Sequence, residues 1–86
     1  MKYYLITCRS VTHAQRVVAA LDHGGVHGNI TRVPKVLADA GCGYAVRISA
    51  RDEHTAAKLL HSTTLKPVRV FADENGAYRE VRHGLS

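Results

Sequence analysis

The stretch ADAGCGYAVRIS places Cys42 between two glycines, Gly41 and Gly43. The reactive form of a cysteine is its thiolate, so the chemistry of this residue depends on the pKa of the thiol. Glycine on both sides leaves the sulfur without bulky neighbours, so the active site of another protein can close around it. The same glycines leave backbone amides free to hold a transient anion. The pattern is equally typical of a plain turn in which Cys42 is a small buried hydrophobic residue.

The second cysteine, Cys8, lies in the segment KYYLITC, whose β-branched and aromatic residues indicate a strand. Two cysteines in a chain without a secretory pattern are not a disulfide framework, and in the cytoplasm they are kept reduced. We interpret Cys8 first as a core residue. The alternative is a resolving thiol that attacks an oxidised or persulfidated Cys42.

The length of 86 residues fits a single domain, which we place at residues 1–82, with 83–86 as a frayed tail. We find no apolar run of the roughly 20 residues that a membrane span needs and no signal-peptide pattern. We therefore expect a cytoplasmic protein without membrane contact. The formal charge of +5 suggests an acidic partner. Because the Lys and Arg residues are scattered, nucleic-acid binding is the less favoured use of that charge.

The first helical pattern follows the opening strand. An apolar stripe from Ala14 to Leu21 recurs at helical spacing. Thr12 and Gln15 have the spacing of an N-terminal capping box, and Gly24 is suited to end the helix.

A second helix is predicted within residues 49–62, opening on the capping pair Ser49 and Asp52. Asn75-Gly76 is a strong hairpin signal and indicates a short fifth strand. The other extended segments surround the two helices and cover residues 2–8, 28–34, 44–49 and 68–72.

The resulting order predicts an α+β fold, a ferredoxin-like βαββαβ sandwich. It has a four-stranded antiparallel sheet, two helices on one face and an extra C-terminal edge strand. Its open edges favour a homodimer. Right-handed crossovers place Cys42 at the end of the sheet where the first helix starts, together with Arg9 and the loop at 63–66.

That position would change the pKa of the Cys42 thiol. Helix amides and nearby cations lower a thiol pKa from about 8.5. Arg9, Thr12 and His13 would shape this field. A helical turn over residues 35–40 would act in the opposite direction, because Cys42 would follow its negative C-terminal end.

The segments YYLITCRSVTHAQR and VPKVLADAGCG, with the strand that follows them, resemble the selenium/sulfur (Se/S) carrier protein-like family of small bacterial domains. The resemblance covers roughly residues 2–72. Its most specific part is a proline followed by a basic residue and, later, a Cys-Gly pair. These residues are Pro34, Lys35, Cys42 and Gly43. The chain has LADAG where members of the family often have a serine-rich stretch.

The resemblance implies a carrier that holds sulfur or selenium on Cys42 as a persulfide or selenopersulfide. The atom would pass from a donor, a desulfurase or selenocysteine lyase, to an acceptor enzyme. Gly41 and Gly43 would give access to the sulfur, and Lys35 would dock a partner or steady an anion. Such an accessory protein needs no cofactor and is not a stand-alone enzyme.

Two alternatives stay open. The first is a regulatory module that binds protein or RNA, with an inert Cys42. An outward-facing Phe71 would suit base stacking, although no aromatic RNA-binding motif accompanies it. The second is a thiol-redox protein that pairs Cys8 with Cys42. The carrier interpretation predicts that Cys8→Ser is still loaded and Cys42→Ser is not. The six histidines lack metal-ligand spacing, so we expect no metal site.

Overall fold

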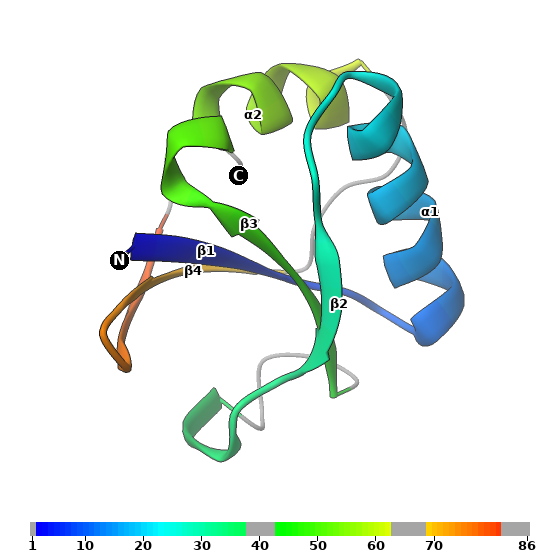
Figure 1. The fold of residues 1–86 in the computed structure, drawn as a ribbon. Helices are drawn as coiled ribbons and strands as arrows, with labels where there is room; N and C mark the ends of the chain where they lie inside the picture. Colours follow the sequence, from blue (N-terminus) through cyan, green and yellow to red (C-terminus); the bar gives the residue numbers. More distant parts are fainter. Residues whose placement is uncertain (1, 38–42, 63–68, 82–86) are drawn as a thin grey trace.

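The computed structural model describes residues 2–37, 43–62 and 69–81. The elements, with η1 and η2 as short 3-10 helices, run in the order β1 (Lys2–Thr7), α1 (Val11–His23), β2 (Asn29–Arg32), η1 (Lys35–Leu37), β3 (Tyr44–Ser49), η2 (Ala50–Asp52), α2 (Glu53–His61), β4 (Val70–Glu74) and β5 (Ala77–Glu80). The strands form one antiparallel sheet in the order β2-β3-β1-β4-β5. Both α-helices lie on the same side of it (Figure 1). The predicted α+β ferredoxin-like sandwich with an extra edge strand is therefore confirmed.

The main core lies between the sheet and the two helices. Alternate residues of the central strands point toward the helices, because side chains along a strand alternate between its faces. Ile6 and Val46 occupy paired positions on β1 and β3, and both are completely buried. They belong to a cluster with buried residues of the helices, Ala14, Val17, Leu21, Ala56, Ala57 and Leu60.

A second, smaller core covers part of the opposite face of the sheet. Leu5, Ala45 and Phe71 are buried there. Three partly buried hydrophobic residues pack against them: Val33, which directly follows β2, Leu37 of η1 and Tyr78 of β5. Phe71 lies on the face of the sheet away from the helices, as predicted, but it is only 4% exposed, so it offers no surface for base stacking.

The start of α1 differs from the sequence prediction. Ser10 has extended backbone angles and acts as the N-cap, and its Oγ accepts the backbone N–H of His13 at 3.1 Å. Thr12 lies inside the first turn, so the predicted capping box of Thr12 and Gln15 is wrong. Ser10 takes the cap because the chain leaves β1 in an extended conformation, which an N-cap residue requires.

α1 ends at His23, directly before Gly24 as predicted, but the left-handed C′ position predicted for Gly24 falls on Gly25. Gly24 caps the helix with a negative φ, whereas Gly25 adopts the left-handed value of 82°. The N–H of Gly25 reaches the carbonyl of Asp22 at 3.0 Å, and that of Val26 reaches Leu21 at 2.9 Å. These two bonds form a Schellman ending, in which the left-handed position favours glycine.

The predicted cap of the second helix is wrong, whereas the predicted hairpin turn is confirmed. Ser49 makes no side-chain cap bond, because the η2 turn comes before α2 and leaves Asp52 at the helix N-cap. The Asn75-Gly76 hairpin is confirmed, with φ values of 55° and 88°. Asp73 Oδ1 accepts the Gly76 N–H at 2.9 Å and stabilises the turn.

Ser10→Ala is expected to lower the free energy of unfolding by about 0.5–2 kcal/mol, because the variant loses the N-cap hydrogen bond. Thr12→Ala is the matched control, since it removes an exposed hydroxyl two residues later in the same turn. Its expected effect is within about 0.5 kcal/mol of zero. Urea denaturation of both variants measures the difference, and equal losses would contradict the assignment of the cap to Ser10.

Candidate functional site

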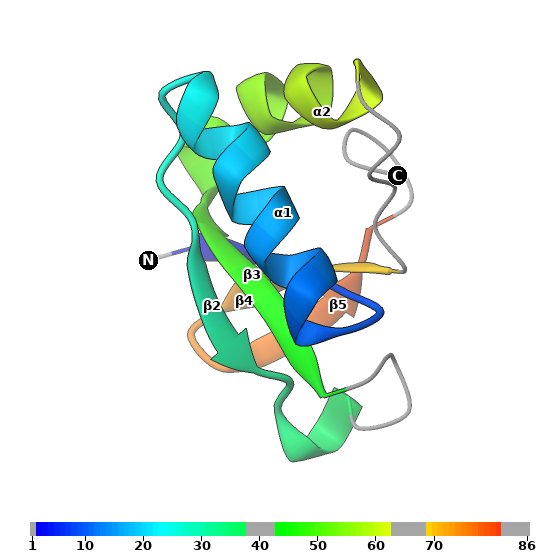
Figure 2. The same ribbon diagram turned by 90° about the vertical axis from the view of Figure 1, so that its right-hand side faces the viewer.

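One end of the sheet gathers most of the predicted site residues that the structure describes. Strand pairing places Thr7 beside Ala45, and Arg32 beside Tyr44. The backbone and Oγ1 of Thr7 also bond to the backbone of Arg69, at the entry to β4. We call this the Thr7 end; the opposite end, where Lys2 pairs with Glu74, is the Lys2 end. Figure 2 shows η1, the start of β3 and the N-terminus of α1 together at the Thr7 end.

Gly43 is the described residue nearest to Cys42 in the chain. Its φ of 102° lies in the region that L side chains rarely adopt. Its carbonyl accepts the N–H of Val33 at 2.9 Å, and the carbonyl of Tyr44 accepts the N–H of Cys8 at 3.1 Å. The backbone that follows Cys42 is therefore held between two neighbouring segments. Cys42, Gly41 and the loop at 63–66 lie outside the described residues.

Cys8 lies at the same end but inside the main core. Its side chain is completely buried, and Sγ lies 3.4 Å from the Ile6 carbonyl as a hydrogen-bond donor. The helices cover it on one side of the sheet. The geometry matches the prediction of Cys8 as a core residue and gives its thiol no contact with solvent.

Arg9 and His13 are brought together at the start of α1. The backbone N–H of Arg9 donates to His13 Nδ1 at 3.0 Å. Burial lowers the pKa of His13 from its usual 6.5, and the positive charges of Arg9 and Arg16 lower it further. The neutral form of His13 is therefore favoured, and the positive charge near it comes from Arg9 and Arg16. Sequence reasoning missed Arg16, whose spacing of three residues from His13 on a helix was the available signal.

The free energy of unfolding is expected to fall as the pH falls below 6.5, in part because of His13. Its folded-state pKa is lowered, so the unfolded state takes up the proton first and becomes favoured. His13→Asn keeps a hydrogen-bond acceptor near the Arg9 N–H but does not titrate. Urea denaturation at pH 7.5 and at lower pH should show a smaller loss in this variant than in the wild type. An identical loss would contradict the role given to His13.

The predicted Pro-basic pair starts the η1 turn. The carbonyl of Pro34 accepts the N–H of Leu37 at 2.8 Å, which closes the turn. Lys35 is the first residue of η1 and is exposed, whereas Pro34 is half-buried. The predicted helical turn is confirmed over 35–37 as a 3-10 helix, and the rest of the predicted turn lies outside the described residues. Thr12 is exposed on the first turn of α1.

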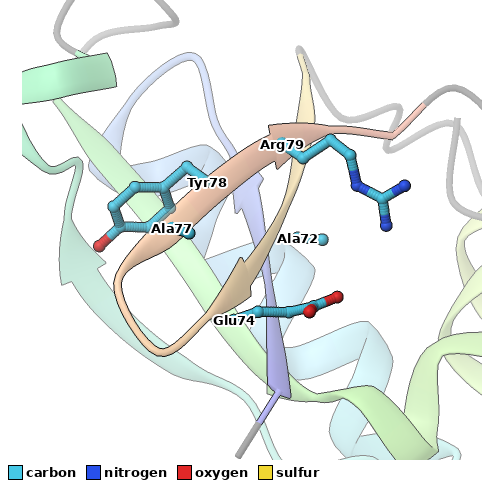
Figure 3. Close-up of a pocket in the computed structure, with 5 residues that line it drawn as sticks. All are labelled: Ala72, Glu74, Ala77, Tyr78 and Arg79. Atoms are coloured by element: carbon cyan, nitrogen blue, oxygen red, sulfur yellow. The ribbon is translucent and has the colours of Figure 1, made fainter.

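Two pockets are lined by residues from the middle of the sheet and from the Lys2 end. One, of about 390 Å³, lies on the β4–β5 hairpin, where the side chains of Glu74 and Arg79 extend to one side and the Tyr78 ring to the other (Figure 3). The other, of about 240 Å³, includes Tyr3 and Ser49, which pair near the Lys2 end. Neither pocket contains a described thiol, so we place no sulfur chemistry in them.

Within the described ranges, no group of three or more His, Cys, Asp or Glu residues is arranged to hold a metal ion. No helix in this part of the chain is long and apolar enough to cross a membrane.

Comparison with known proteins gave one match. The family model described as "Putative Se/S carrier protein-like" matches residues 3–72. The matched range contains both cysteines, the Pro34-Lys35 pair and the Cys42-Gly43 pair. No curated protein and no solved structure matched the chain.

Proposed function

The chain belongs to the Se/S carrier protein-like family, and from this premise we propose that Cys42 carries sulfur or selenium as a persulfide or selenopersulfide. The observation that carries the assignment is the burial of Cys8. The chain has two cysteines, and the side chain of Cys8 has no exposed surface. Cys42 is then the thiol that can meet a partner.

Loading is a transfer between two sulfur atoms that needs no external oxidant. The Cys42 thiolate attacks the outer sulfur of a donor persulfide, R–S–SH. A new S–S bond forms at Cys42, the S–S bond of the donor breaks, and the donor leaves as the thiolate R–S⁻. The outer sulfur becomes the outer atom of the Cys42 persulfide. Selenium in R–S–SeH follows the same course, and an acceptor thiolate removes the cargo by the reverse type of attack.

The surroundings of Gly43 support this role. Arg9 and Lys35 supply positive charge on the two segments that flank Gly43, and cations favour a thiolate over a thiol. Gly41 and Gly43 have no side chains to obstruct the sulfur, and Pro34 begins the turn that presents Lys35. Thr12, which is exposed, and His13, whose neutral form is favoured, are the other polar side chains of the proposed site.

The donor is a desulfurase or a selenocysteine lyase, and the acceptor is an enzyme that uses the delivered atom. We place this exchange in the cytoplasm, where thiols are kept reduced. The burial of Cys8 weighs against a thiol-redox pair, and the burial of Phe71 weighs against an RNA-binding module.

The rate of alkylation at each cysteine, followed against pH by peptide mass spectrometry, tests the proposal. We expect Cys42 to react with an apparent pKa below about 8.5, and Cys8 to react only after unfolding. Two cysteines that both react slowly in the folded protein would contradict it.

A further inference from the structure

We propose that the Thr7 end carries a docking surface for the protein that delivers the cargo, and this inference rests on the proposed function of Cys42. The partner that fits it has an acidic contact face that includes apolar side chains. The docking surface consists of Arg9, Val11, Arg16, Arg32, Lys35 and Val36.

Two exposed valines supply the apolar part of the docking surface. Val11 is 42% exposed at the first position of α1, and Val36 is 74% exposed in η1. Among the described residues, the one other large hydrophobic side chain with comparable exposure is Ile30, in the edge strand β2. Single exposed valines are ordinary. These two lie on the two segments that flank the backbone following Cys42.

The hydrogen bonds of the backbone define that arrangement. Val33 donates to Gly43 from one side, at the entry to η1, and Cys8 donates to Tyr44 from the other, at the approach to α1. Figure 1 shows the start of β3 between η1 and the N-terminus of α1. η1 and the start of α1 therefore flank Gly43, the described residue next to Cys42 in the chain.

Positive charges outnumber negative ones among the described residues of this end. Arg9, Arg16, Arg32 and Lys35 are exposed, and the first two lie close enough to His13 to lower its pKa. Of the carboxylates in the described part of the chain, Glu80 alone lies at the Thr7 end, and it is paired with Arg69 at 2.9 Å. The others lie toward the Lys2 end or on the helix ends next to it, at Asp22, Asp52, Glu53, Asp73 and Glu74.

This separation of charge favours an acidic partner and acts mainly on the rate of encounter. The guanidinium of Arg32 lies 5.5 Å from the centre of the Tyr44 ring, and this cation–π contact restrains the position of its charge. A donor with carboxylates and apolar side chains on its contact face would thus be guided to the Thr7 end. Burial of the valines would then slow its release.

The test compares two sources of the same cargo. The initial rate of Cys42 loading is measured with a persulfidated cysteine desulfurase and with an uncharged alkyl persulfide at equal persulfide concentration. Their ratio cancels any change in the reactivity of the thiol itself. The double variant R16E/R32E is compared with R51E/R79E, which makes the same change of charge at exposed arginines outside the docking surface.

We expect the desulfurase to load the wild type faster than the alkyl persulfide does. The ratio should fall about tenfold in R16E/R32E and much less in R51E/R79E. Val36→Ser should also lower the ratio of the two loading rates, whereas the control Ile30→Ser should leave it unchanged. Because Val36 is a single exposed residue, this variant tests the docking surface even if R16E/R32E folds poorly. Added salt should reduce the advantage of the wild type.

Equal losses in the two double variants would overturn the docking surface, and so would a wild type that the desulfurase loads no faster than the alkyl persulfide. Failure of the alkyl persulfide to load wild-type Cys42 is a different result. It would overturn the proposed function of Cys42 and, with it, the docking surface.

Discussion

Cys42→Ser is expected to reduce cargo loading to background, whereas Cys8→Ala is expected to load as the wild type does. A serine hydroxyl is far less acidic than a thiol and forms no persulfide, so the first variant has no acceptor atom for the cargo. Cys8 is completely buried, and its removal leaves the Thr7 end in place. The loaded fraction is measured by intact-protein mass spectrometry after exposure to a donor persulfide.

Alanine is the better substitution at Cys8, because serine would bury a more polar group in the main core. Cys8→Ser is nevertheless expected to load once it is shown to be folded. Two outcomes would contradict the account. One is cargo on Cys8 in the Cys42→Ser variant. The other is a folded Cys8→Ala variant that no longer loads, which would indicate that the two thiols work as a pair.

Ile6→Ala is expected to lower the free energy of unfolding by about 2–5 kcal/mol. Ile6 is completely buried at the centre of the sheet, paired with Val46 on one side and Val70 on the other. The deletion leaves a cavity against both helices. Since small domains are stable by only about 5–15 kcal/mol, this loss is a large part of the total.

Ile30→Ala makes the same chemical change at a site that is 40% exposed on the edge strand β2. Its expected effect on the free energy of unfolding is below about 1 kcal/mol, because little buried surface is lost. Urea denaturation of both variants gives the comparison. Similar losses at the two sites would contradict the position of the core between the sheet and the helices.

The order of the elements could be predicted because each signal was local. The stripe from Ala14 to Leu21 has helical spacing, the β3 sequence alternates, and Asn75-Gly76 specifies its own turn. The choice of cap was harder, because Ser10 and Thr12 both offer a hydroxyl. The backbone conformation after β1 selects Ser10, and this conformation depends on how β1 and α1 pack together rather than on the local sequence.

The burial of Phe71 could not be predicted from its own strand. Its cover comes from η1 and β5, which are distant in sequence and reach it only through the fold. The faces of β1 were also hard to assign from the sequence. From Leu5 to Cys8, just past the end of the strand, the residues on both faces of the sheet are buried, so polar and apolar residues do not alternate.

Parts of the candidate site could be predicted. The sequence predicted that Cys42 shares one end of the sheet with Arg9 and the start of the first helix. Cys42 lies outside the described residues, and the strand pairing and backbone bonds place its neighbour Gly43 at that end. The left-handed φ of Gly43 and the exposure of Val36 required the structure. The register of β2 against β3 brings η1 next to Gly43, and register depends on contacts between segments.

The location of the cargo in the wild-type protein shows directly whether Cys42 is the carrier residue. After reaction with a donor persulfide, the remaining thiols are blocked, the protein is digested, and each cysteine peptide is examined by mass spectrometry. We expect one added sulfur or selenium atom on the Cys42 peptide, removed by a reducing agent, and an unmodified Cys8 peptide. Cargo on Cys8, or on neither cysteine of the folded protein, would contradict it.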